Sequence, residues 1–218
     1  MRLNKYINES KIVIDTEDPD EIASILRNSC SKYLHMLNSI SGRMGKKMIY
    51  RGISNTKSNF MQVTPRKDRK PLDTPPIIHN YLDDLFKKKF GWKARSEGVM
   101  TSTRPRRMYG RMYYFFPADG FKFLYSNEVN DLYMDLEDRL QMIDDPYSDE
   151  LLSLDTITLD DLMKPEVQKI AKKLIDTYQQ NKNFKDVYSH STEIMWKCKY
   201  YYVLSADWST SNAVLEKL

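Results

Sequence analysis

The sequence predicts an α+β fold with largely antiparallel sheets. Segments with helical spacing and segments with strand character are mixed along the 218 residues without regular strand–helix alternation. A GxGxxG motif, which opens many doubly wound α/β folds, is absent. With 41% hydrophobic and 29% charged residues, the chain fits one globular domain, or a domain with a helical annex, that has its own core.

The first element is expected to be a helix. Asp18 is a good side-chain cap, Pro19 fits the first helical position, and two acids follow on the positive end of the dipole. Apolar residues then recur at three- and four-residue steps over 22–40. This pattern predicts one amphipathic helix that ends near Gly42.

A strand, a loop, a second helix and another strand are expected next. MIYRGI (48–53) has strand character, whereas the polar stretch 54–76 contains four prolines and predicts an extended loop. Helical spacing returns from about 76 to 89. GVMTST (98–103) predicts a short strand that ends in hydroxyl groups.

A hairpin is the next expectation. MYYFFP (112–117) and FKFLYS (121–126) are two apolar runs rich in aromatic residues. Asp119 and Gly120 between them form a turn signal. The two runs are therefore predicted to pair with each other.

The C-terminal third is expected to hold two helices and a long strand. Helical spacing covers 128–143 and 159–181, and the acidic run 144–150 between them predicts a surface loop. Residues 192–205 alternate over a length typical of one long strand. The remainder, 206–218, is a polar tail.

The charge is unevenly distributed although the net charge is only +4. One interpretation is an ordinary solvated surface, and the other is a basic face for polyanions such as nucleotide phosphates or nucleic acid. The basic runs are 43–47, 66–70, 87–89 and 104–107, and the acidic region is 127–161.

Composition argues against several classes of protein. No apolar run approaches the roughly 18 residues of a membrane span, and the N-terminus lacks the apolar core of a signal peptide, so a cytoplasmic protein without a membrane partner is expected. Cys30 and Cys198 are far apart and are expected to be reduced core residues. The three histidines are scattered, which predicts that no metal is bound.

Three polar features stand where apolar residues would pack better. They are Arg51 within an apolar strand, the hydroxyl trio 101–103 at a strand end, and Glu193 at a strand start. A buried arginine costs several kcal/mol unless an anion meets it. That anion is either a ligand phosphate or an internal carboxylate, and the trio and Glu193 have the ordinary alternative of exposed strand-end residues.

Taken in this order, the three features resemble the Arg-Ser-Glu signature of the ADP-ribosyltransferase superfamily. Arg51 in YRG matches the first motif, Ser102 in TST the second, and Glu193 the glutamate of a late strand. The resemblance spans about 45–205 and implies a split pair of mostly antiparallel sheets with flanking helices. It further implies an N-terminal helical region (1–44), a catalytic domain (45–205) with an acidic helical insertion at about 128–181, and a C-terminal tail (206–218).

The resemblance implies a glycosyltransferase that transfers ADP-ribose from NAD. Glu193 would stabilise the positive charge that develops on the ribose, and Ser102 would position Glu193 and the sugar. Arg51 would bind the pyrophosphate through its two-pronged guanidinium, and Gly52 would let the backbone approach the ligand.

Further NAD contacts are expected around these three residues. Tyr50, Thr101 and Thr103 belong to the matched motifs. Tyr109 is expected to stack on nicotinamide, with Tyr113 as its alternative and core packing as the competing role of both.

One departure from the family concerns the acceptor. Arginine-modifying members carry Glu-x-Glu, but Ser191 occupies the first of these positions here. Arginine is therefore not the expected acceptor. A host protein, a nucleic acid or water remain, and the neighbouring basic runs favour nucleic acid or an enzyme bound to it.

Three sequence segments also resemble proteins of tailed bacteriophages: LNKYINE, RKDRKP and KKFGWKARSEGV. This implies a phage protein that takes part in host takeover, either in the host cytoplasm or in the virion. Two non-enzymatic alternatives stay open. One is a phage structural or host-interaction protein that retains the fold, and the other is a basic nucleic-acid-binding module.

Overall fold

The computed structural model describes residues 9–40, 47–54, 56–70, 74–105, 110–142, 154–190 and 193–218. It confirms a mixed α+β protein with mainly antiparallel strand pairs. The chain forms two compact units, each assembled from separate segments. Unit 1 comprises 1–67, 104–121 and 197–218, and unit 2 comprises 68–103 and 122–196.

Unit 1 is built on five strands in the order β1-β3-β9-β5-β2, and each neighbouring pair is antiparallel. One of these strands corrects the sequence prediction, because β3 lies inside the expected loop 54–76 and is mostly buried. The prolines of that stretch follow β3 rather than interrupt it. The strands are β1 (Ser10–Val13), β2 (Tyr50–Ile53), β3 (Phe60–Thr64), β5 (Arg111–Pro117) and β9 (Tyr201–Ser205).

The N-terminal helix is two helices, α1 (Pro19–Ser29) and α2 (Ser31–Ile40). The predicted start is confirmed, since the Asp18 side chain accepts a hydrogen bond from the backbone of the second helical residue. The single continuous helix is wrong, and Asp119 supplies the reason. Its backbone N–H donates to the last carbonyl of α1, at Ser29, and its carboxylate accepts from the Lys32 backbone N–H and the Ser31 hydroxyl at the start of α2.

The C-terminal tail contains a helix, α8 (Ser211–Glu216), which packs against α1. Lys217 fixes this arrangement twice. Its carbonyl accepts from Arg27, and its ammonium pairs with Asp20 at 2.7 Å. The tail is therefore a folded part of unit 1, as are the N-terminal helices.

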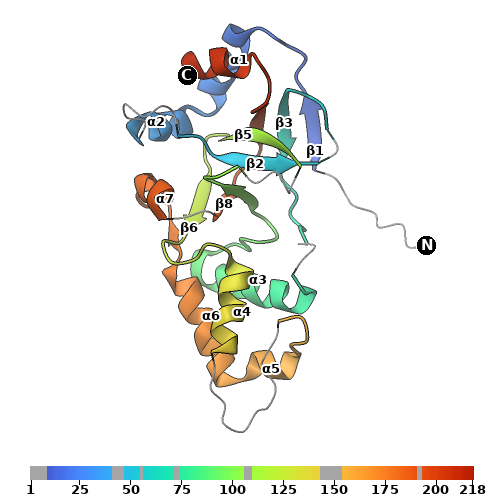
Figure 1. Ribbon diagram of the computed structural model, residues 1–218, viewed down its shortest axis with the longest axis vertical. Helices are drawn as coiled ribbons and strands as arrows, with labels where there is room; N and C mark the ends of the chain where they lie inside the picture. The colour runs from blue at the N-terminus through green and yellow to red at the C-terminus, as the bar shows by residue number, and fades with distance from the viewer. Residues whose placement is uncertain are drawn as a thin grey trace, which may run out of the picture. The chain divides into compact units, whose positions relative to one another are not determined.

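In its described residues, unit 2 combines five helices with four short strands. Helices α4 and α6 lie side by side (Figure 1), α3 packs against α6, and the three contribute to one core of buried, mainly aliphatic and aromatic side chains. The helices are α3 (Pro76–Phe90), α4 (Leu132–Gln141), α5 (Leu159–Met163), α6 (Pro165–Thr177) and α7 (Phe184–His190). The strands run in the order β4 (Val99–Ser102), β8 (Glu193–Lys197), β6 (Lys122–Tyr125) and β7 (Gln179–Gln180).

Two further long elements of the sequence prediction are divided in the structure. The helix predicted over 159–181 is α5 and α6, because Pro165 holds the preceding Lys164 in an extended conformation. The strand predicted over 192–205 is β8 and β9, which pair with different strands.

The predicted hairpin is wrong. β5 pairs with β2 and β9, whereas β6 pairs with β7, and the two strands belong to different units. The Asp119-Gly120 turn does form, with Gly120 at a φ of 87°. The Asp119 carboxylate accepts hydrogen bonds at the junction of α1 and α2. The predicted turn is therefore confirmed, but the strands on either side of it pair with strands elsewhere in the sequence.

Candidate functional site

The structure brings two of the three motif residues together. β4 and β8 are antiparallel neighbours whose register places Ser102 directly opposite Glu193. Opposed residues on neighbouring strands project from the same face of a sheet, with Cβ atoms about 5 Å apart. Both side chains are half-buried, and the Oε1 atom of Glu193 is enclosed. A hydroxyl and a carboxylate therefore lie side by side at one end of the strand pair.

Thr101 faces the other way. Its hydroxyl accepts a 2.7 Å hydrogen bond from the indole of Trp196 and donates to the carbonyl of Ile194 at 3.4 Å. Trp196 is fully buried against Phe123, with ring centroids 5.2 Å apart. These contacts give Thr101 a structural role. Ser102 is therefore the strand hydroxyl beside Glu193, and Thr103 is a half-buried residue that follows the strand.

The face that carries Ser102 and Glu193 continues into the core of unit 2. Met100 and Met195 are the next opposed pair on that face, and they pack with Tyr178 in the same hydrophobic cluster. Burial raises the pKa of Tyr178 well above its usual value, and the charge of Glu193 raises it further, whereas the charge of Arg95 lowers it. Tyr178 therefore stays a neutral phenol near both charges.

Arg51 has an internal anion. Its Nη2 donates to Glu9 Oε1 at 2.7 Å, its Nε donates to the Tyr201 hydroxyl at 2.9 Å, and that hydroxyl donates to Glu9 Oε2 at 2.8 Å. Burial by itself would lower the pKa of Arg51, but Tyr201 and Glu9 outweigh it and raise the pKa. Arg51 belongs to unit 1 and Ser102 and Glu193 to unit 2. The internal carboxylate accounts for the burial of Arg51 without a ligand.

The other predicted NAD contacts in unit 1 have structural partners or lie outside the described residues. Tyr50 packs against Tyr114 at 5.6 Å, and Gly52 is half-buried opposite Met112. Tyr113 is fully buried and donates to the Ser58 carbonyl at 2.8 Å, which is the core-packing role. Tyr109, Ser191 and the acidic run 144–150 lie outside the described residues.

The two cysteines are free thiols. Cys30 is buried, and its Sγ donates to the Phe116 carbonyl at 3.6 Å. Burial raises the pKa of Cys198 to about 12, where Arg51 lowers it and Glu9 raises it. Both thiols stay protonated at neutral pH, so neither has the thiolate form of a nucleophile.

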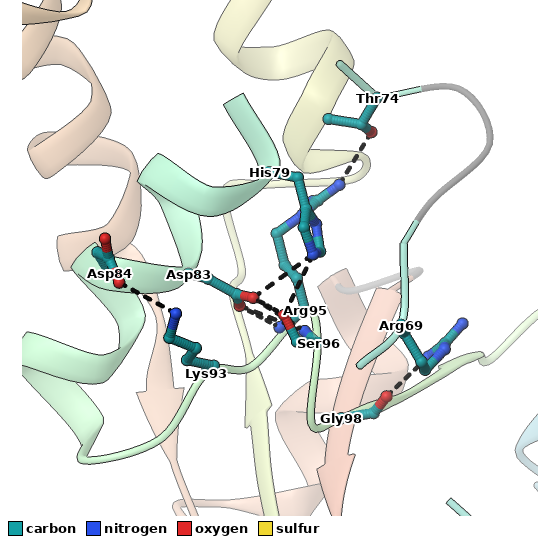
Figure 2. A network of polar contacts seen from close by, with 9 residues as sticks. All are labelled: Arg69, Thr74, His79, Asp83, Asp84, Lys93, Arg95, Ser96 and Gly98. Atoms are coloured by element: carbon teal, nitrogen blue, oxygen red, sulfur yellow. Dashed lines mark hydrogen bonds and ion pairs between the residues drawn. The ribbon is translucent and has the colours of Figure 1, made fainter. Parts of the chain in front are cut away.

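Sequence reasoning missed a buried polar network in unit 2 (Figure 2), centred on Asp83, His79 and Arg95. Asp83 is fully buried in α3 and accepts from the backbone N–H groups of Arg95 and Ser96. The Ser96 hydroxyl also donates to Asp83, and His79 Nε2 lies 3.5 Å from the same carboxylate. The arginine in WKARSEG gave no sequence signal of burial, because its neighbours in sequence include Lys93, Ser96 and Glu97, whereas Arg51 lies in an apolar run.

Where the structure describes the basic runs, they are only partly available for a polyanion, and 43–46 and 106–107 lie outside the described residues. Arg69 donates to the Gly98 carbonyl at 2.7 Å, and Lys89 pairs with Asp176 at 3.1 Å. Lys67, Lys70 and Lys87 are exposed. Some of these side chains are therefore exposed, which fits either interpretation, and others are structural.

No family model, curated protein or solved structure matches the chain. In the described part of the chain, no three histidine, cysteine, aspartate or glutamate side chains are grouped so that they could hold a metal ion together. The same residues include no helix with both the length and the apolar character that crossing a bilayer requires. The chemistry of the Ser102–Glu193 pair is thus the main guide to function.

Proposed function

We propose that the chain is a phage-encoded mono-ADP-ribosyltransferase of the Arg-Ser-Glu class, which transfers ADP-ribose from NAD to a host macromolecule. The observation that carries the proposal is the register of β4 and β8, which sets Ser102 opposite Glu193. A carboxylate that faces a sugar stabilises positive charge on the ring, and a neighbouring hydroxyl can hold the carboxylate and a ribose hydroxyl.

The reaction breaks the bond between nicotinamide and ribose. As nicotinamide leaves with the bonding electrons, the ring develops oxocarbenium character, and the acceptor then bonds to the same carbon. Glu193 would act by electrostatic stabilisation and by a hydrogen bond to the 2′-hydroxyl. Because Glu193 is half-buried with an enclosed oxygen, its charge would act in a medium of lower dielectric than bulk water.

Arg51 matches the arginine of the Arg-Ser-Glu motif, but Glu9 and Tyr201 already accept hydrogen bonds from its guanidinium. Phosphate binding by Arg51, with help from Gly52 and Tyr50, therefore stays a prediction. The acceptor is proposed to be a host protein or a nucleic acid rather than arginine, because the sequence has Ser191 where arginine-modifying enzymes have a glutamate. The proposed place of action is the host cytoplasm, with the virion as the alternative.

The test is transfer of label from NAD to bacterial lysate by the full chain. Glu193→Gln should lower the transfer rate by at least about a hundredfold, because one preorganised electrostatic group is worth about 3–4 kcal/mol. Ser102→Ala should lower it by a smaller factor. Glu166→Gln is the matched control, since Glu166 is an exposed residue of α6 in the same unit.

Two results would contradict the proposal. Equal labelling by the wild type and Glu193→Gln would remove Glu193 from the mechanism. The absence of both labelling and NAD turnover in the wild type would remove the enzyme. Comparing protein and nucleic-acid fractions of the labelled lysate would then distinguish the two kinds of acceptor.

A second candidate is a non-catalytic phage structural or host-interaction protein that retains the fold. The closed Arg51–Glu9–Tyr201 arrangement favours it, because it explains the motif arginine without NAD. This candidate predicts no stabilisation by NAD. An NAD-binding protein should instead gain about 2.7 kcal/mol at a hundred times the dissociation constant, which a thermal melt detects.

A further inference from the structure

Two arginines of the described residues are buried to the same extent but are satisfied differently. Arg51 and Arg95 are each 9% exposed. Arg51 has the carboxylate of Glu9 at 2.7 Å. Arg95 donates from Nε to His79 Nδ1 at 3.4 Å and from Nη2 to the Thr74 hydroxyl at 3.0 Å, and both acceptors are neutral. Figure 2 shows the Arg95 side chain running past His79 toward Thr74.

The nearby carboxylate does not neutralise the Arg95 guanidinium directly. Asp83 contacts the backbone N–H of Arg95 rather than its side chain, at 2.8 Å. Its remaining acceptor capacity is taken by Ser96, through both backbone and hydroxyl, and by His79. Within the described ranges, the Arg95 guanidinium has no ion pair with a carboxylate, and its remaining N–H groups have no acceptor.

A buried guanidinium without an anion is costly, and the cost is recovered when an anion binds. Arg95 offers the means: a fork of N–H donors that matches a phosphate, with its outer nitrogen held by the Thr74 hydroxyl. At 9% exposure the residue is not completely enclosed.

We propose that Arg95, steadied by His79 and Thr74, binds a phosphate group of the substrate, the role that the sequence suggested for Arg51. The assignment of this anion to a dinucleotide rests on the proposed function. Arg95 belongs to the same unit as Ser102 and Glu193. The charges of Arg95 and Glu193 both shift the pKa of Tyr178, Arg95 downward and Glu193 upward, so both lie near that residue.

The experiment measures binding of inorganic pyrophosphate and of ADP-ribose to the full chain by calorimetry. Arg95→Lys keeps the charge of a buried arginine and removes the two-pronged donor geometry, and Arg27→Lys makes the same change at an exposed arginine of α1 as the matched control. Arg95→Lys should weaken both ligands by about tenfold or more, the value of a lost hydrogen bond to a charged group. Arg27→Lys should leave both affinities within about twofold of the wild type, since Arg27 has no part in the proposed site.

Wild-type affinity in Arg95→Lys, or failure of the wild type to bind either ligand, would overturn the assignment. If Arg95→Lys does not fold, the side-chain Nε–H resonance of Arg95 in the wild type decides. A shift on pyrophosphate addition supports the site, and an unchanged resonance at saturation overturns it. Binding of pyrophosphate that depends on Arg95, in a protein that never consumes NAD, would sink the transferase proposal and leave the anion site standing. NAD turnover with affinities independent of Arg95 would do the reverse.

Discussion

The substitution Glu9→Gln is the most direct perturbation of the buried ion pair between Arg51 and Glu9 in unit 1. Arg51 and Glu9 are 9% and 11% exposed, and their charged atoms are 2.7 Å apart. Glu9→Gln leaves the guanidinium buried without its counter-charge. Glutamine also offers one oxygen where Glu9 uses two, so either the bond from Arg51 or the bond from Tyr201 is lost.

The expected loss of unfolding free energy is about 3 kcal/mol, the lower end of the 3–5 kcal/mol typical of breaking a buried pair, because one hydrogen bond survives. For a chain of this size that corresponds to a melting temperature about 6–12 °C lower. The assay is urea unfolding followed by hydrogen exchange of peptides from β1, β2 and β9, since two units need not unfold together.

Asp20→Asn is the matched control. Asp20 and Lys217 also lie 2.7 Å apart in unit 1, but their side chains are 71% and 38% exposed. An exposed pair contributes at most about 1 kcal/mol. Equal losses for Glu9→Gln and Asp20→Asn would refute the argument that burial makes the Arg51 pair important.

Three further predictions concern the stability of the two units. Asp119→Ala should cost about 0.5–2 kcal/mol, the usual cost of losing a helix cap, and raise hydrogen exchange where α1 meets α2, because two donors at the start of α2 lose their acceptor. Burial lowers the pKa of His79 below 6.5; the charge of Asp83 raises this pKa and the charge of Arg95 lowers it. Because the folded pKa is below the unfolded one, the stability linked to neutral His79 is fully present above pH 6.5 and is lost as the pH falls through the folded pKa. Chemical denaturation from pH 8 to 5 should show this loss, and His79→Gln should remove that part of the pH dependence. Gly98→Ala should destabilise unit 2 in a thermal melt, because the added Cβ would overlap the carbonyl oxygen of Ala94.

Local signals predicted the start of α1 and the approximate bounds of α3, but not the ends of the long predicted elements that are divided in the structure. The start of α1 at Asp18 follows from a side chain that caps its own helix, and α3 ends at Gly91 in a left-handed conformation that glycine adopts readily. These signals act within a few residues. Residues far apart in sequence decided the rest, as where Asp119 divides α1 from α2.

The candidate site shows the same division. Ser102 and Glu193 were chosen from sequence, and the register of β4 and β8 sets them opposite each other. The partner of Arg51 could not be predicted, because Glu9 is 42 residues away and reaches it through the pairing of strands. Arg95 was overlooked because its run does not resemble the matched motifs, although the cost of burying its charge applies equally.

By itself, the sequence determined the kinds of local element and the residue types available for chemistry, because hydrogen bonding along a helix, proline geometry and side-chain capping depend on near neighbours. Only the tertiary structure decided which strands pair and which buried charge has a counter-ion. Those outcomes depend on contacts between distant segments, so the pairing of Glu9 with Arg51 and the neutral hydrogen-bond acceptors of the Arg95 side chain became visible only in the fold.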